Sequence, residues 1–235
     1  MAEIVIIGGT SGIGRELALS CALAGADVVV AGRDLERATR CAAQLSIGLG
    51  ADAGRIRGLA ADLSQPHTLE IALRSVSAVE HLVLAAIDRD QNTLANFNID
   101  AAIVMATVKL VGYAAATALL KDRFVEGGSV LVFGGMAKDR PYPGSTTVTS
   151  VNAGVLGLSH TMMHELKPLR VNTIHPGVVG DSPYWANNEA VLEFGKRTAL
   201  TGVLPRMQDI VDGCQFLMRN PSANGVHLSL DGGRP

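Results

Sequence analysis

Short runs of consecutive apolar residues alternate along the chain with longer segments in which apolar residues recur every three or four positions. The first two runs are Ile4–Ile7 and Val28–Ala31, and both end next to glycine. Such runs are typical of strands that are buried on both faces of a parallel sheet. Further strands are predicted over residues 56–60, 81–86, 128–133, 171–175 and 226–230.

The segments between these strands have helical composition and predict helices over residues 15–24, 35–45, 66–75, 98–121, 147–166 and 207–219. Asp34 stands directly before the second helix, where its carboxylate can cap free backbone N–H groups. Regular alternation of strand and helix predicts a parallel sheet with helices on both faces. We therefore expect an α/β fold, a Rossmann-type doubly wound sheet in a single domain over residues 1–235, with no repeat or linker.

Two irregular stretches, 134–146 and 176–206, follow predicted strands. Long loops at the carboxyl ends of parallel strands usually form the ligand site. We expect residues 181–206 to be a lid over the substrate.

The composition of the chain limits the classes of partner that it can bind. Hydrophobic residues make up 48% of the chain and charged residues 18%, which excludes a disordered protein. The net charge of −2 offers no basic surface for nucleic acid or an anionic membrane. The longest apolar stretch, Ile99–Leu120, contains Asp100 and Lys109 and therefore predicts a buried helix and not a membrane span.

The cysteines Cys21, Cys41 and Cys214 are far apart and form no CxxC or Cys/His cluster. Neither a metal site nor a disulfide framework is expected, and the thiols are predicted to be buried. Met1–Ile7 lacks the basic start and long apolar core of a signal peptide. These features predict a cytoplasmic protein.

A glycine-rich turn joins the first predicted strand to the first predicted helix. Glycine allows a sharp turn and a close approach to a pyrophosphate, and the helix N-terminus supplies free N–H groups. In this strand–turn–helix setting the glycines indicate a dinucleotide site. The predicted cofactor contacts here are Gly8, Thr10, Ser11, Gly12, Ile13 and Gly14.

The end of the second strand selects the nucleotide. An acidic residue there would hold the ribose 2′-hydroxyl of NAD, whereas an arginine accommodates the 2′-phosphate of NADP. Arg33 occupies this place, and its planar fork suits a phosphate. The expected cofactor is NADP(H).

Residues 7–14, Ile-Gly-Gly-Thr-Ser-Gly-Ile-Gly, together with Arg170–Gly177 and Leu230–Gly233, resemble the short-chain dehydrogenase/reductase family over nearly the whole chain. The resemblance implies an asparagine on the long helix, which we assign to Asn98. It also implies a homodimer or homotetramer that packs through the helices at 98–121 and 147–166. Further cofactor contacts implied by the resemblance are Asp62, Leu63, Ala85, Asn152, Pro176, Gly177 and Val179.

The resemblance also implies a catalytic serine, and a tyrosine and lysine spaced Tyr-x-x-x-Lys. The matching positions hold Gly135, Val148 and Asn152 instead. No other register restores the motif, because the chain's three tyrosines, Tyr113, Tyr142 and Tyr184, are followed four residues later by Thr117, Thr146 and Asn188.

Two classes of function remain open. The first is an atypical NADP(H)-dependent oxidoreductase that acts on a small organic carbonyl, imine or enone. The second is a non-redox NADP-binding protein: a sensor, a partner subunit, or a catalyst that uses the cofactor as a scaffold. Substitute catalytic groups are Asn98, Arg140 and Tyr142, and the predicted substrate contacts are Met136, Asp181, Tyr184 and Trp185.

Overall fold

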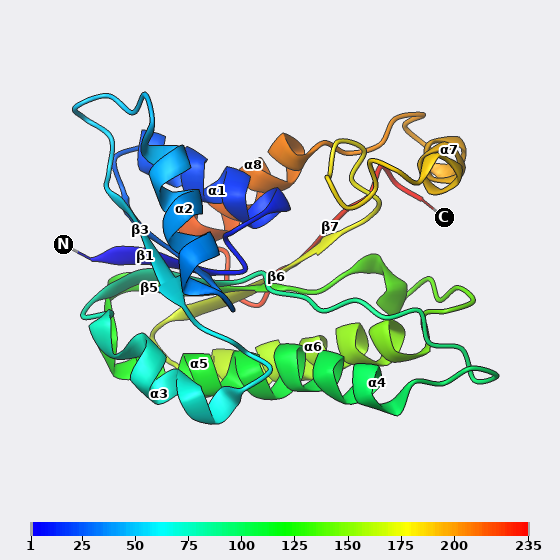
Figure 1. Ribbon diagram of the computed structural model, residues 1–235, viewed down its shortest axis with the longest axis horizontal. Coiled ribbons are helices and arrows are strands. Elements are labelled where there is room, and N and C mark those ends of the chain that lie inside the picture. The colour runs from blue at the N-terminus through cyan, green and yellow to red at the C-terminus, as the bar shows by residue number, and fades with distance from the viewer. Residues whose placement is uncertain (1, 235) are drawn as a thin grey trace.

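Seven parallel strands form one sheet in the order β3-β2-β1-β4-β5-β6-β7 in the computed structural model, which describes residues 2–234 (Figure 1). Every neighbouring pair of strands is parallel, which confirms the predicted doubly wound sheet. The strands are β1 (Glu3–Ile7), β2 (Asp27–Gly32), β3 (Ile56–Ala60), β4 (Val79–Leu84), β5 (Phe124–Phe133), β6 (Arg170–Pro176) and β7 (His227–Leu230).

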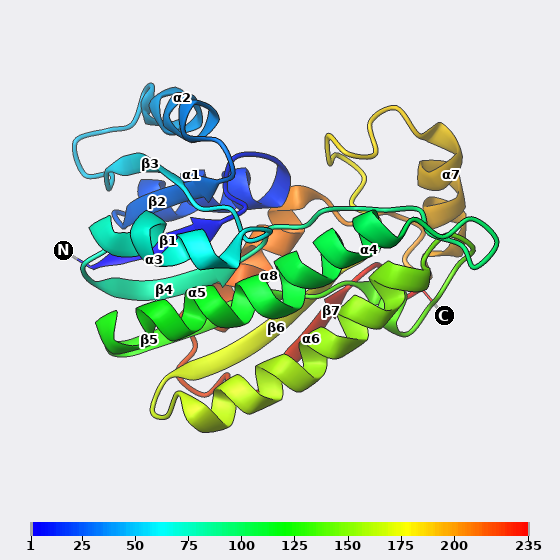
Figure 2. The same cartoon turned by 60° about the horizontal axis from the view of Figure 1, so that its bottom comes forward.

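Helices cover both faces of the sheet. One face carries α1 (Gly12–Leu23), α2 (Leu35–Ser46) and α8 (Met207–Arg219) (Figure 1). The other carries α3 (Leu69–Ala72), α4 (Ile99–Ala106), α5 (Tyr113–Leu120) and α6 (Thr146–Glu165) (Figure 2). α7 (Glu189–Thr198) stands away from both layers, near the C-terminus.

The apolar strands contribute side chains to two hydrophobic cores, one on each face of the sheet. In β1, Ile4 and Ile6 pack into the core beneath α1 and α8, whereas Val5 and Ile7 pack into the core beneath α5. Because successive strand residues point to opposite faces, a strand covered on both sides must be apolar throughout.

Local structure departs from the predicted helices in three places. The long helix predicted over residues 98–121 contains a π-helical turn, Thr107–Gly112, between α4 and α5. The predicted helix at 66–75 is reduced to α3 between two 3₁₀ turns, Pro66–Thr68 and Leu73–Ser75. Within the predicted lid, α7 is a helix that the sequence did not predict.

The segment Ile99–Arg123 is long and apolar enough, by length and composition, to cross a membrane. In this structure the segment lies along the sheet beside α6 as part of the helical layer (Figure 2). Buried side chains from it, including Met105, Tyr113 and Leu120, are fully enclosed. This packing matches the predicted core helix.

Two smaller predictions are confirmed. The Asp34 carboxylate accepts a hydrogen bond from the backbone N–H of Arg37 at 2.6 Å and caps α2. The three thiols, Cys21, Cys41 and Cys214, are free and buried. Burial raises the pKa of Cys21 to about 11, so this thiol is neutral and unreactive at physiological pH.

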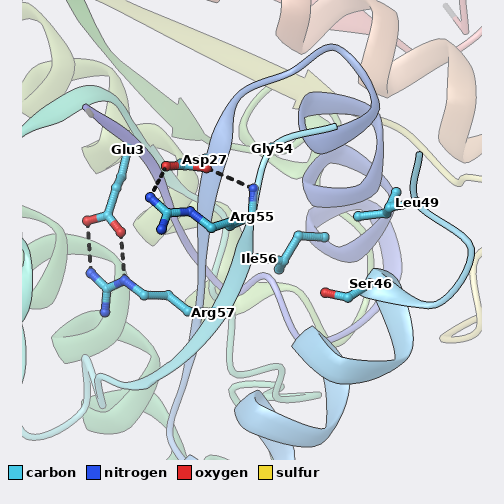
Figure 3. Close-up of a pocket in the computed structure, with 8 residues that line it drawn as sticks. All are labelled: Glu3, Asp27, Ser46, Leu49, Gly54, Arg55, Ile56 and Arg57. Carbon is cyan, nitrogen blue, oxygen red and sulfur yellow. Dashed lines mark hydrogen bonds and ion pairs between the residues drawn. The ribbon is translucent and has the colours of Figure 1, made fainter. Parts of the chain in front are cut away.

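A pocket of about 610 Å³ opens at the amino ends of β1, β2 and β3 (Figure 3). Its two arginines are already paired, Arg55 with Asp27 and Arg57 with Glu3. The glycine-rich turn follows the opposite, carboxyl end of β1. The pocket is therefore separate from the predicted cofactor site.

Candidate cofactor and catalytic site

The glycine-rich turn forms a cradle that side chains would fill. A Cβ on Gly14 would lie 2.3 Å from the Gly8 carbonyl oxygen, and a Cβ on Gly8 would lie 2.4 Å from the Ala86 nitrogen. Gly8 also has a φ of +100°, which favours glycine. Ser11 precedes α1 without capping it through its side chain, so N–H groups of the first turn remain free. Thr10 and Ile13 complete the turn, which fits a nucleotide pyrophosphate.

Arg33 follows β2 and its side chain is 66% exposed. Its guanidinium pairs with Asp88 at 2.8 Å, and Asp88 lies in the loop after β4. Asp62 accepts hydrogen bonds from the backbone and hydroxyl of Ser64, which fixes the turn after β3. Leu63 is buried, and its carbonyl oxygen lies 2.5 Å from where a Cβ on Gly112 would stand. Only glycine permits this close approach between the turn and the π-helical segment.

The remaining predicted cofactor contacts gather at the carboxyl ends of the central strands. Ala85 donates its backbone N–H to Ile7 directly after β4. Pro176 ends β6, and Gly177 donates its N–H to Leu230 of β7. Val179 points its side chain into the core, so only its backbone can face a ligand.

The three positions of the missing triad lie on two neighbouring elements. Gly135 follows β5 with an extended backbone, and a Cβ on it would lie 2.7 Å from the Asn152 Nδ2 atom. Val148 lies one helical turn before Asn152 on α6. The Val148 side chain packs with Met105 and Val151 in a small apolar cluster. The space that the resemblance assigns to a catalytic hydroxyl therefore holds no polar group from this position.

Lys109 is a candidate site residue that the sequence analysis missed. It lies within the π-helical turn, its residue is 1% exposed, and its Nζ donates to the Asn152 Oδ1 at 2.7 Å and to the Gly134 carbonyl oxygen at 3.1 Å. Burial, followed by the charge of Arg89, lowers the pKa of Lys109 to about 7. No carboxylate in residues 2–234 forms an ion pair with it.

Asn98 does not occupy the site that we assigned to it. It is exposed, and its Oδ1 accepts from the Ala101 N–H at 3.0 Å, so it caps α4. Asn98 stands at the start of the long helix, whereas Lys109, eleven residues further along it, contacts Asn152. Lys109 is what the long helix presents to Asn152.

Asn92 is a second residue that the sequence analysis missed. Its buried amide donates to Asp90, to the Asn98 carbonyl and to the Thr147 hydroxyl, and so ties the loop after β4 to α6 beside Val148. The second carboxylate oxygen of Asp90 is buried without a partner. A buried carboxylate oxygen favours a ligand that brings a donor or a positive charge.

Arg140 and Tyr142, the other two predicted catalytic groups, lie in different surroundings. Arg140 forms an ion pair with Asp231 near the C-terminus, so its charge is already matched and does not serve an oxyanion. Tyr142 is 53% exposed, and partial burial raises the pKa of its hydroxyl. Met136 begins a 3₁₀ turn next to Gly135, which keeps it beside the site.

The predicted lid contacts the loop after β4 through aromatic rings. Tyr184 and Trp185 pack edge to face with centroids 4.5 Å apart. The Arg89 guanidinium lies 4.0 Å from the Tyr184 centroid and 5.4 Å from that of Trp185, within cation–π range. Asp181, predicted to touch substrate, accepts instead from the Met207 N–H at 2.7 Å and holds the start of α8.

A chain of histidines leaves the site toward the surface. The Gly135 N–H donates to the His175 Nδ1 at 3.2 Å. The His175 Nε2 lies 3.5 Å from the His227 Nδ1, and the His227 Nε2 lies 2.9 Å from the Nε2 of exposed His160. Burial, with smaller effects from Lys138, lowers the pKa of His175 to about 3, so its ring is neutral.

Comparisons with known proteins agree with this geometry. The model of the short chain dehydrogenase family matches residues 2–191. The short-chain dehydrogenase/reductase ucsE of Acremonium sp is 28% identical over 98% of this chain and 94% of its own. A 3-oxoacyl-[acyl-carrier-protein] reductase of Bos taurus is 27% identical over 97% of this chain and 95% of its own.

Among solved structures, the MalC Reductase/Diels-Alderase from Malbranchea aurantiaca superposes with a TM-score of 0.89 at 25% identity, covering 99% of this chain and 95% of its own. The match extends over the sheet, both helical layers and the lid segment. The chain therefore belongs to the short-chain dehydrogenase family of oxidoreductases, which bind a nicotinamide cofactor and act on small molecules.

Proposed function

We propose that this chain is an NADP(H)-dependent oxidoreductase that acts on a small organic substrate without a Tyr/Lys acid–base pair. One contrast carries the proposal: the glycine cradle is complete, whereas Val148 fills the tyrosine position within an apolar cluster. The cradle residues would hold the dinucleotide, which supplies or accepts a hydride when bound. The chain's own contribution is then to bind, to orient and to exclude water.

The absence of a proton donor at Val148 favours certain acceptors. A ketone oxygen must be protonated as it is reduced, and a positioned acid typically contributes about 10²–10⁴ in rate. A cationic imine needs no such proton, because reduction neutralises it. The carboxylate oxygen of Asp90 that has no partner within residues 2–234 suits a positively charged substrate, and the ring of Trp185 suits a flat one. We therefore place imines ahead of ketones and enones.

The preference for NADP(H) rests on Arg33. Its only ion-pair partner within residues 2–234 is Asp88, and both side chains are at least one-third exposed. An exposed ion pair is worth about 0–1 kcal/mol, so the 2′-phosphate can displace the carboxylate. The end of β2 offers no carboxylate to hold a ribose 2′-hydroxyl, since Asp34 is used as the cap of α2.

A second candidate is a catalyst that uses the bound cofactor as a wall and transfers no electrons. The Malbranchea aurantiaca protein is named a Reductase/Diels-Alderase, and this name describes both kinds of activity for that protein. The apolar cluster around Val148 would suit a substrate that reacts by proximity alone.

The test measures cofactor binding and consumption separately. Wild type and Arg33→Ala are titrated with NADPH and NADH, and we expect Arg33→Ala to weaken NADPH about tenfold without changing NADH. Wild type is then assayed for NADPH consumption with matched ketones, imines and enones. Fast reduction of ketones would reveal an acid elsewhere and contradict the proposal. Tight NADPH binding without consumption of any acceptor would favour the second candidate or a sensor.

We also propose that the chain assembles as a homodimer or homotetramer through α4 and α5. Ile103 and Val111 are 58% and 53% exposed on this segment, a surface that a partner helix would cover. Light scattering should give a dimer or tetramer for wild type and a smaller particle for Val111→Lys. A wild-type monomer contradicts this arrangement.

A further inference from the structure

Lys109 and Asn152 form a buried pair that nothing in the family resemblance assigns. The Lys109 Nζ donates to Asn152, and in its ammonium form, below about pH 7, it can only donate, so the group facing it must be an acceptor. The contact of 2.7 Å therefore fixes the Asn152 amide with its oxygen toward Lys109 and its NH₂ on the other side. An asparagine amide can usually flip, but beside this partner it has one orientation.

The freed NH₂ lies directly over Gly135. A Cβ at Gly135 would stand 2.7 Å from the Nδ2 atom, so the lack of a side chain there is what lets the amide take this place. Gly135 follows β5 at the carboxyl edge of the sheet, the same edge as the glycine cradle after β1. The amide thus presents two N–H donors on the side of the sheet where the nucleotide binds.

Two features of the fold hold Lys109 in this position. A π-helical turn interrupts the long helix over Thr107–Gly112, and such turns occur frequently at functional sites. The Nζ is held by two neutral acceptors, the Asn152 Oδ1 and the Gly134 carbonyl oxygen. Burying an amine without a carboxylate partner is unfavourable, and such groups persist mainly where they serve a function.

We propose that Lys109 and Asn152 divide the work of a single lysine: Lys109 is a positioning residue that aims the Asn152 amide, and Asn152 donates to the ribose of the nicotinamide half of the cofactor. This inference rests on the proposed NADP(H) function and deepens it. Asparagine and lysine have thereby exchanged elements relative to what the resemblance implies, with lysine on the long helix and asparagine on α6.

The test compares two ligands that differ in the half of the cofactor concerned. NADPH carries the nicotinamide ribose, whereas 2′,5′-ADP carries only the adenosine half and its phosphates. Lys109→Met is titrated with both, and Lys121→Met, an exposed lysine at the end of the same helical segment, is the matched control. We expect Lys109→Met to weaken the binding of NADPH about tenfold and to leave the affinity for 2′,5′-ADP within twofold of that of wild type. Lys121→Met should change neither.

A purely structural role predicts something else. If Lys109→Met weakens both ligands equally, or leaves NADPH binding unchanged, the inference is overturned. If Lys109→Met folds poorly, the exchange variant, Lys109→Asn with Asn152→Lys, provides a second test of the pairing. We expect it to bind NADPH within about threefold of wild type, whereas Asn152→Lys alone, which places two ammonium groups together, should bind it much more weakly. An exchange variant no better than that single variant contradicts the pairing.

Binding is measured here without any acceptor. If wild type binds NADPH but none of the acceptors tested causes NADPH to be consumed, the oxidoreductase proposal fails. The comparison of NADPH with 2′,5′-ADP still decides the role of Lys109. If consumption proceeds and the two ligands respond alike, only the inference about Lys109 fails.

Discussion

The two halves of the site are built on opposite principles. The nucleotide half is a backbone structure in which a Cβ added at Gly8 or at Gly14 collides with neighbouring main chain. The catalytic half, around Val148 and Asn152, is a side-chain structure in which an apolar cluster and a buried amine replace the residues that the resemblance implies. The close backbone contacts at Gly8 and Gly14 leave no room for a side chain. The side chains at Val148 and Asn152 can differ from those of the family while the backbone around them stays the same. The comparison shows that main-chain contacts constrain the nucleotide half, whereas side-chain packing shapes the catalytic half.

The nucleotide half should therefore be the more fragile. Gly14→Ala places a Cβ 2.3 Å from the Gly8 carbonyl, and neither backbone segment can move without opening the cradle. We expect NADPH affinity to fall about a hundredfold and stability to drop by about 1–3 kcal/mol. Calorimetric titration and thermal unfolding measure the two effects. Gly157→Ala on α6, where a Cβ meets nothing within 4 Å, is the control and should change neither by much.

The catalytic half should show its buried amine as a pH effect on stability. The pKa of Lys109 is about 7 in the folded protein and about 10.5 when unfolded, so between these values the unfolded chain binds more protons. Relative to Lys109→Met, the free energy of unfolding of wild type should rise with pH from 7 to 9, by about 1.4 kcal/mol per pH unit.

Below pH 7 the difference between the two proteins should be constant. Arg89 is present in both proteins and cancels in the comparison. Lys109→Met also removes one of the charges that lower the pKa of His175, but that ring titrates near pH 3, far below the range compared. Denaturant unfolding at several pH values provides the measurement. A flat difference from pH 7 to 9 would mean that the Lys109 amine stays protonated in the fold.

Restoring one family residue should not restore the family's chemistry. Val148 is 9% exposed and packed against Met105 and Val151, so Val148→Tyr overfills the cluster. We expect a loss of about 1–3 kcal/mol and no gain in ketone reduction. Val203→Tyr, at a position 61% exposed, serves as the control and should stay within about 0.5 kcal/mol. Rapid ketone reduction by Val148→Tyr would show that a tyrosine alone completes the catalytic half.

The smallest effect concerns the border between the nucleotide half and the loop after β4. Asp88→Asn removes the carboxylate that competes with a 2′-phosphate for Arg33. NADPH should bind about two- to threefold more tightly, NADH should not change, and the gain should shrink as salt is added. Weaker NADPH binding by this variant would indicate that Asp88 holds Arg33 in its binding position.

The sequence predicted the nucleotide half well because its signals are local. Strand, glycine turn and helix follow one another within a few residues, and Asp34 caps the helix that it precedes. The catalytic half depends on a contact between residues 43 positions apart, Lys109 and Asn152, and on a π-helical turn that leaves no mark in composition. One signal was available: Lys109 is the lone basic residue within the apolar stretch Ile99–Leu120, where a lysine on a buried face cannot be solvated.

Errors in the sequence analysis have similar causes. Asn98 caps the helix that it precedes, and Asp181 accepts from the first N–H group of α8, 26 residues further along the chain. Arg140 is matched to Asp231, which is 91 residues away along the chain. Tertiary partners of this kind decide what a polar side chain is free to do, and they lie outside any local pattern.

The histidine chain from Gly135 gives the site a reporter made of its own side chains. Because the Gly135 N–H donates to the His175 Nδ1, that ring must carry its proton on Nε2, which then faces the His227 Nδ1. The tautomer of one ring thus sets that of the next, out to exposed His160. Nitrogen chemical shifts of His160 should therefore change when a ligand displaces the backbone at Gly135. His160 is the third histidine of the chain that starts at Gly135.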